Sequence, residues 1–189
     1  MNLFCIRHGE TEWSISGQHT GVTDIPLTEN GRELAKRLKP SLSRFSFSMV
    51  LVSPLKRALE TCALAGQADN AVIDADLMEW NYGDFEGLTS AQIQADNPDW
   101  VLFRDGCPNG ESPQEVKNRV DSIIDRALAV DGDVALFAHG HVLRTLAARW
   151  IGLPPEEGAR FLLDTGTLCV LGFYRKERAI RIWNAPLVS

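Results

Sequence analysis

Two histidine–glycine pairs hold the side chains best suited to chemistry in this sequence. His8-Gly9 follows Arg7 at the end of a mostly apolar run, and His139-Gly140 ends a second such run. A neutral imidazole can attack phosphorus and form a phosphohistidine, which divides one difficult transfer into two easier steps. An arginine presents a planar fork of donors to phosphate oxygens, and a glycine lets backbone N–H groups approach them closely. The pattern indicates phosphoryl chemistry, and the alternative is a core histidine hydrogen-bonded to backbone.

A second arginine lies where it can reach the same phosphate. The sequence predicts a helix with Ser53 as N-cap and Pro54 in its first position, which places Arg57 in the first turn. There it lies near the positive end of the helix dipole and can turn back toward the strand ends. Lys56 beside it is expected to be solvated. His139 could donate a hydrogen bond to the equatorial oxygens and stabilise charge in the transition state.

A carboxyl group is also needed, because a sugar alkoxide leaves only if it receives a proton as the P–O bond breaks. A loop over 79–87, rich in aromatic residues and glycine, contains two candidates, Glu79 and Glu86. Glu10 is expected to be a local hydrogen-bonding residue of the site.

Strands alternate with helices along the chain, which predicts the α/β class. Strands are expected over 2–7, 48–52, 71–75 and 133–138, with a closing pair over 166–174 and 179–183. Helices are expected from Thr28 until Pro40 stops the first of them, then over 89–95, 112–129 and 142–150. The architecture should be a three-layer sandwich, a mostly parallel sheet with helices on both faces. Ligands of such sheets bind beyond the carboxyl ends of the strands, where the polar residues stand.

Composition limits the partners. The 189 residues are 44% hydrophobic and 23% charged, which predicts a single globular domain over 1–189. A net charge of -6 argues against a nucleic-acid or membrane surface, but a small anionic substrate remains compatible with it. The first residues contain no signal-like or membrane-spanning stretch, so a cytoplasmic location is expected. The four cysteines are far apart and without ligand spacing, so neither a metal nor another cofactor is expected.

In this order the motifs resemble those of the histidine phosphatase superfamily, in the branch with phosphoglycerate mutases and fructose-2,6-bisphosphatases. The resemblance runs from Arg7-His8-Gly9 to the closing strands and implies a phosphoglycerate mutase-like fold. It implies that His8 is the nucleophile and that Glu79 is the proton donor. Glu86 is the competing carboxylate, for which a structural role is expected. The phosphate-binding residues that it implies are Arg7, Arg57 and His139.

At finer grain, segments 13–21, 79–84, 103–107, 138–141 and 161–164 resemble fungal sedoheptulose-1,7-bisphosphatases. Mutases usually have asparagine where this chain has Ser14. Arg104 could contact a second phosphate or instead pair with Asp105 to stabilise its loop. The candidate substrate-binding residues on this comparison are Ser14, His19, Thr20, Gly21, Arg104 and His141, of which His19 and His141 could equally have structural roles.

Three functional classes fit these residues: a phosphatase, a mutase and a non-catalytic phosphate-binding module. A binding module would be expected to have lost a reactive residue, and none is missing. Mutases of the family generally carry an insertion between the acid loop and the second His-Gly motif and a covering tail, and this chain is short in both places. We therefore expect a phosphatase for a small phosphorylated substrate, such as sedoheptulose 1,7-bisphosphate. A phosphoglycerate mutase and a broad-specificity phosphatase are the alternatives, and assembly into a homo-oligomer stays open.

Overall fold

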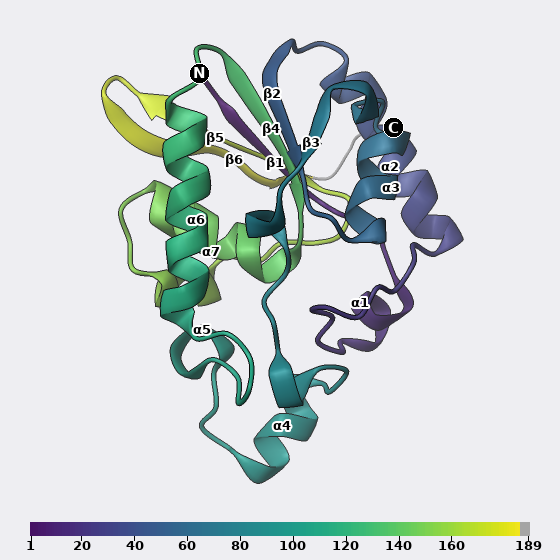
Figure 1. Ribbon diagram of the computed structural model, residues 1–189, viewed down its shortest axis with the longest axis vertical. Helices are drawn as coiled ribbons and strands as arrows, with labels where there is room; N and C mark the ends of the chain where they lie inside the picture. Colours follow the sequence, from purple (N-terminus) through teal and green to yellow (C-terminus); the bar gives the residue numbers. More distant parts are fainter. Residues whose placement is uncertain (186–189) are drawn as a thin grey trace.

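A computed structural model of the chain describes residues 1–185, and its core is a six-stranded sheet in the order β3-β2-β4-β1-β5-β6. Figure 1 shows this sheet between two groups of helices. The strands are β1 (Leu3–Arg7), β2 (Phe47–Val52), β3 (Ala71–Ile73), β4 (Asp133–Ala138), β5 (Leu168–Tyr174) and β6 (Glu177–Ala185). The first four run parallel, and β5 and β6 are antiparallel to their neighbours. The predicted mostly parallel sheet is confirmed.

Both faces of the sheet are covered, as the apolar strands require. Helices α2 (Glu29–Leu42) and α3 (Lys56–Leu64) pack on one face, over Phe4 and Ile6 of β1. Helices α6 (Pro113–Leu128) and α7 (Gly140–Trp150) pack on the other face, over Leu3 and Cys5. In Figure 1 the first pair lies to the right of the sheet and the second pair to the left. The predicted three-layer α/β architecture is therefore confirmed.

Short elements connect the strands and the longer helices. The α-helical ones are α1 (Glu12–Ser16), α4 (Ser90–Asp96) and α5 (Leu102–Asp105). The 3-10 turns are η1 (Ala68–Asn70), η2 (Ala75–Leu77), η3 (Gly83–Phe85) and η4 (Pro155–Arg160). Over residues 1–185, no helix has the length and apolar character needed to cross a bilayer.

Some helix boundaries differ from the prediction. Helix α7 begins at Gly140 and not at Val142, and α2 ends later than expected. Pro40 does not stop α2, which continues to Leu42. Proline fixes φ at a helical value, and the carbonyl that it deprives of a partner belongs to Lys36, on an exposed turn. Buried Leu38 and Leu42 hold the last turn on the core.

Ser53 is not the N-cap of α3. The helix begins at Lys56 after Leu55, which makes no side-chain cap bond. Arg57 still lies in the first turn, as predicted.

The third strand is also shorter than predicted. It ends at Ile73, because the Asp74 side chain accepts a hydrogen bond from the N–H of Asp76 and starts η2.

Candidate active site

The register of the sheet brings the two His-Gly motifs together. Arg7 pairs with Ala138 at the ends of β1 and β4, and the N–H of His8 donates to the carbonyl of Ala138 at 3.0 Å. The N–H of Ser53 donates to the carbonyl of Phe137 on the other side of β4. Three strand ends therefore meet at one edge, where the sequence placed the site.

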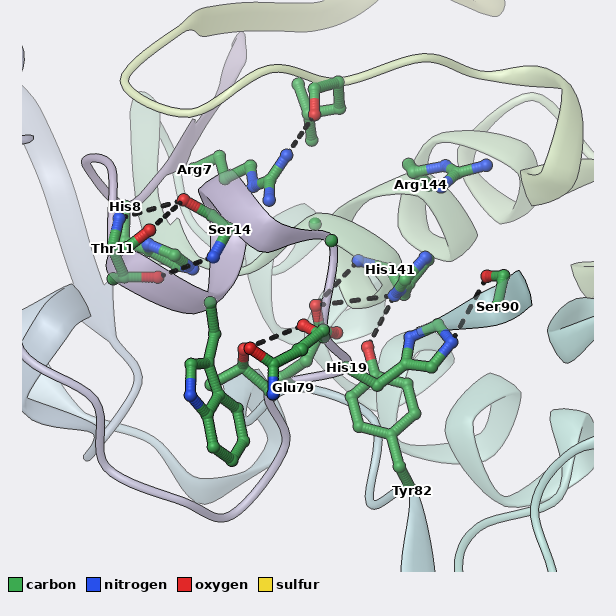
Figure 2. Close-up of a pocket in the computed structure, with 16 residues that line it drawn as sticks. Arg7, His8, Thr11, Ser14, His19, Glu79, Tyr82, Ser90, His141 and Arg144 are labelled. Carbon is green, nitrogen blue, oxygen red and sulfur yellow. Dashed lines mark hydrogen bonds and ion pairs between the residues drawn. The ribbon is translucent and has the colours of Figure 1, made fainter. Parts of the chain in front are cut away.

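A cavity of about 220 Å³ opens in front of this edge (Figure 2). Seven predicted site residues line it: Arg7, His8, Ser14, His19, Thr20, Glu79 and His141. Arg57, His139, Gly21 and Arg104 do not line it. The lining also contains residues that the sequence analysis did not single out, among them Thr11, Trp13, Gln18, Tyr82, Ser90 and Arg144.

His8 has the geometry of a nucleophile. Its Nδ1 lies 2.7 Å from the carbonyl oxygen of Gly9, which can only accept, so Nδ1 is the protonated nitrogen. Burial lowers the pKa of His8, and the positive charges of Arg7 and Arg57 lower it further. The ring is therefore neutral, and its Nε2 keeps a lone pair.

Gly9 is required for a packing reason and not for the phosphate contact that the sequence suggested. Its N–H donates to Thr61 Oγ1 at 3.0 Å and is not free for a phosphate. A Cβ at this position would lie 2.3 Å from the carbonyl oxygen of Gly31. The glycine is required because α2 packs against the backbone of the motif.

Arg7 lies beside His8, with its guanidinium fixed from one side. Its Nη1 donates to the carbonyl oxygen of Leu163, while its Nε is buried without a hydrogen-bond partner in the part of the chain that is described. Figure 2 shows this guanidinium reaching from the β1 end toward the cavity. An anion in the cavity would supply an acceptor for its remaining donors.

Arg57 and His139 form a buried layer behind His8. Arg57 Nε donates to Nδ1 of His139 at 3.1 Å, so the proton of the neutral His139 ring is on Nε2, 2.7 Å from Ser53 Oγ. Burial lowers the pKa of His139, and the charge of Arg57 adds to this effect. The His139 and His8 rings lie 5.1 Å apart. Ser53, expected to cap a helix, therefore orients an imidazole instead.

The guanidinium of Arg57 also shapes the loop that forms one side of the site. Its Nη atoms donate to the carbonyl oxygens of Thr20, Gly21 and Thr23 at 3.0 Å each. These bonds use the donors that the sequence analysis assigned to a phosphate. In this structure the loop over 20–23 receives them.

Of the two competing carboxylates, only Glu79 faces the cavity. Its Oε1 accepts from the N–H groups of Trp80 and Val142, and its Oε2 accepts from that of His141. Glu79 is thereby fixed at the first turn of α7, close to the second His-Gly motif. The carboxylate of Glu86 accepts from the backbone N–H groups of Gly21 and Thr23 and holds that loop.

The wall opposite Arg7 consists of neutral aromatic rings. The hydroxyl of Tyr82 lies 2.5 Å from His141 Nδ1, and the His19 ring packs 4.7 Å from the ring of Tyr82. Burial lowers the pKa of His19 to about 4 and also lowers that of His141. Ser90 Oγ lies 3.4 Å from His19 Nε2.

Three other predicted loop residues, Ser14, Thr20 and Gly21, make local contacts that support the wall of the cavity. Ser14 forms a capping box with Thr11 at the start of α1. Thr20 donates its hydroxyl to the carbonyl oxygen of Gln18. At Gly21 a Cβ would lie 2.5 Å from the carbonyl oxygen of Trp80, so the loop packs there backbone against backbone.

Arg104 lies outside the cavity. Its side chain is more than half exposed, and it forms two 2.8 Å bonds with the Asp105 carboxylate and a third with the carbonyl oxygen of Asp99. This is the loop-stabilising arrangement that the sequence left open for it. Besides Arg7, the cavity is lined by a different arginine, Arg144. It lies three residues after His141, on the same face of α7, and that helical spacing was the signal for it.

The four histidines predict destabilisation by acid. Burial lowers the pKa of each of them: His8, His19, His139 and His141. Below about pH 6.5 the unfolded chain binds protons that the folded chain does not, so the free energy of unfolding falls as the pH falls. Each neutral histidine contributes a slope of about 1.4 kcal/mol per pH unit once the unfolded form is protonated.

We expect His19→Gln to reduce this slope by about 1.4 kcal/mol per pH unit, the contribution of one proton, between pH 6 and pH 4.5. The free energy of unfolding is measured by urea denaturation at a series of pH values. Exposed Lys36→Gln is a control that removes no histidine. Equal slopes for the wild type and His19→Gln would show that His19 is protonated in the folded protein.

Comparisons with known proteins agree with this geometry. The family model of the histidine phosphatase superfamily (branch 1) matches residues 3–186. An acid phosphatase of Mycobacterium tuberculosis is 42% identical over 185 residues, which cover 95% of this chain and 90% of that protein. The sedoheptulose 1,7-bisphosphatase of Saccharomyces cerevisiae is 36% identical, over 78% of this chain and 66% of its own length. A solved structure of a Mycobacterium tuberculosis open reading frame matches with a TM-score of 0.94 and 39% identity, covering 98% of this chain and 97% of the other.

Proposed function

Because this chain belongs to the histidine phosphatase superfamily (branch 1), we propose that it hydrolyses a small phosphate monoester through a phosphohistidine on His8. The observation that carries the proposal is the hydrogen bond from His8 Nδ1 to the Gly9 carbonyl oxygen. It leaves Nε2 unprotonated at the cavity, beside the guanidinium of Arg7. A nucleophile with a free lone pair and a cation for the phosphate oxygens are the two parts that phosphoryl transfer needs first.

The proposed reaction has two steps. With the phosphate held by Arg7, His8 Nε2 forms a bond to phosphorus while the bond to the ester oxygen breaks, and Glu79 gives that oxygen a proton. Water then attacks the phosphohistidine, Glu79 takes a proton from it, and His8 and inorganic phosphate are released. The second step returns the proton to Glu79 and frees His8, so the enzyme ends in its starting state.

Arg57 and His139 support the same steps from behind the nucleophile. The charge of Arg57 helps to keep His8 neutral. For His139 to bind a phosphate oxygen, its Nε2–H would have to exchange Ser53 Oγ for that oxygen. The proposal assigns this exchange to substrate binding, when a charged acceptor becomes available.

A sugar bisphosphate is the proposed substrate class. The yeast relative, which is 36% identical over 78% of this chain, is named for such a substrate. The cavity of about 220 Å³ shares lining residues with a second cavity of about 230 Å³, which leaves room for a substrate longer than a simple monophosphate.

A panel of esters tests the function. We expect kcat/KM to be higher for sedoheptulose 1,7-bisphosphate or fructose 1,6-bisphosphate than for 3-phosphoglycerate and an aryl phosphate. Binding at the non-reacting end supplies energy that positions the reacting phosphate. Rates should be the same with and without excess chelator, because Arg7 supplies positive charge beside His8 and Arg57 adds to it from behind. A clear preference for 3-phosphoglycerate would overturn the substrate class, and loss of all activity on chelation would overturn the mechanism.

A further inference from the structure

The end of the cavity remote from the nucleophile contains one cationic side chain, that of Arg144. Figure 2 shows His8 and Arg144 on opposite sides of the cavity, with His141 on the Arg144 side. A second cavity of about 230 Å³ adjoins this end, since the two share His19, Ser90, His141 and Arg144 in their walls. Arg144 therefore lies at the junction of the two spaces.

The guanidinium of Arg144 is fixed but not saturated. Its Nε donates to the carbonyl oxygen of Gly158 at 3.2 Å, and its Nη2 donates to that of Ala159 at 3.1 Å. The ring of Phe103 lies 4.6 Å below the guanidinium. An arginine has five N–H donors, so three remain without an acceptor in residues 1–185. The guanidinium of Arg144 is therefore held in one orientation while most of its N–H donors have no acceptor among the described residues.

Burial lowers the pKa of Arg144, the charge of Glu79 opposes that shift, and within residues 1–185 no carboxylate forms an ion pair with Arg144. Its neighbours His19 and His141 stay uncharged, because burial lowers the pKa of each. Glu79 is the one carboxylate among the residues that line the cavity, and it is bound by three backbone N–H groups. A partly buried arginine without a carboxylate partner is a site for an external anion.

We propose that Arg144 holds a second anionic group of the substrate, a phosphate or a carboxylate, at the end remote from His8. This inference rests on the proposed function and gives Arg144 a role for which the sequence analysis offered Arg104 as one candidate. Arg104 bonds with Asp105 on the outer surface, whereas Arg144 lines the cavity. Arg144 is thus a specificity-determining residue that selects substrates with anions at both ends.

Matched pairs of esters test the inference. One pair compares fructose 1,6-bisphosphate with each of its two monophosphates, and the other compares 3-phosphoglycerate with glycerol 3-phosphate. The members of a pair differ only in the remote anion, so the ratio of their kcat/KM values isolates its contribution. We expect the wild type to prefer the member with two anions, and Arg144→Gln to lower that preference about 10- to 100-fold. A preference in the first pair alone identifies a phosphate, and one in the second pair alone identifies a carboxylate.

Three further variants make the result specific. Arg144→Lys keeps a positive charge over Phe103 but loses the planar fork of donors, so it should keep part of the preference for two anions. If Arg144→Gln does not fold, the ratio measured for Arg144→Lys tests the inference. Arg104→Gln tests the competing residue, and exposed Arg160→Gln, paired with Glu157, is the matched control. Both should keep the wild-type ratio. Thermal unfolding of each variant separates misfolding from lost recognition.

The inference is overturned if Arg144→Gln keeps the wild-type ratio, or if Arg104→Gln abolishes it. It is also overturned if the wild type shows no preference in either pair. In that last case, hydrolysis of an aryl phosphate with a label on His8 would leave the phosphatase mechanism standing. Absence of any phosphatase activity would instead overturn the proposed function itself.

Discussion

His8→Ala is expected to reduce the hydrolysis of every phosphate ester by roughly 10³-fold or more, because it removes the atom that attacks phosphorus. The loss should be in kcat more than in KM, since Arg7 remains to bind the phosphate. In the wild type, rapid quenching during turnover should trap a phosphoryl group that is labile in acid and stable in base. That label should map to His8.

The label also distinguishes the two strand-end histidines. His139 has both ring nitrogens engaged, one by Arg57 and one by Ser53, whereas His8 has Nε2 free. We therefore expect no label on His139 in His8→Ala. A second variant, His8→Asn, keeps an amide donor that can reach the Gly9 carbonyl oxygen and removes only the nucleophile. Substantial turnover in both variants, with unchanged thermal stability, would falsify the assignment of His8 as the nucleophile.

The location of this site could be predicted from the sequence because strand ends are local features. Apolar runs that stop at His8 and His139 are visible in the chain, and parallel pairing of β1 with β4 brings their ends together. The family resemblance then assigned the nucleophile and the acid. Both residues were identified from local motifs, and the structure places both at the cavity.

The direction in which a side chain points could not be predicted in the same way. Arg57 was correctly placed in the first turn of α3, yet its donors bind the carbonyl oxygens of the loop over 20–23. Ser53 looked like an N-cap because Ser-Pro is typical of helix starts, but it lies against His139. Both outcomes depend on a loop and a strand that are distant in sequence.

Arg104 and Arg144 show the same limit, because the direction of each side chain could not be read from its motif. Arg104 was singled out because its segment is one of those that resemble sedoheptulose-1,7-bisphosphatases, while Arg144 was passed over as part of a helix. The short α5 turns Arg104 toward Asp105 and away from the site, and the helical period of α7 turns Arg144 into it. A helical projection from Gly140 onward would have predicted the second of these placements.

Glu79 is the residue whose role in chemistry is hardest to separate from its role in structure. Its carboxylate accepts three backbone N–H groups, two of them from the first turn of α7. In Glu79→Gln the amide NH₂ would face at least one of these donors, which costs stability on the order of 1–3 kcal/mol. A simple loss of activity in this variant would therefore not show that Glu79 transfers a proton.

The ratio of the hydrolysis rates of two substrates does show whether Glu79 transfers a proton. Glu79→Gln should slow the hydrolysis of a sugar phosphate by about 10²–10⁴-fold, and that of an aryl phosphate far less, because a phenolate leaves without a proton. Any loss of folded protein or of His8 positioning lowers both rates equally and cancels in their ratio. Glu86→Gln is the matched control, since Glu86 also binds backbone N–H groups but does not line the cavity, so its substrate ratio should stay that of the wild type. Equal losses on both substrates in Glu79→Gln would remove it as the proton donor, and a changed ratio in Glu86→Gln would assign that role to Glu86.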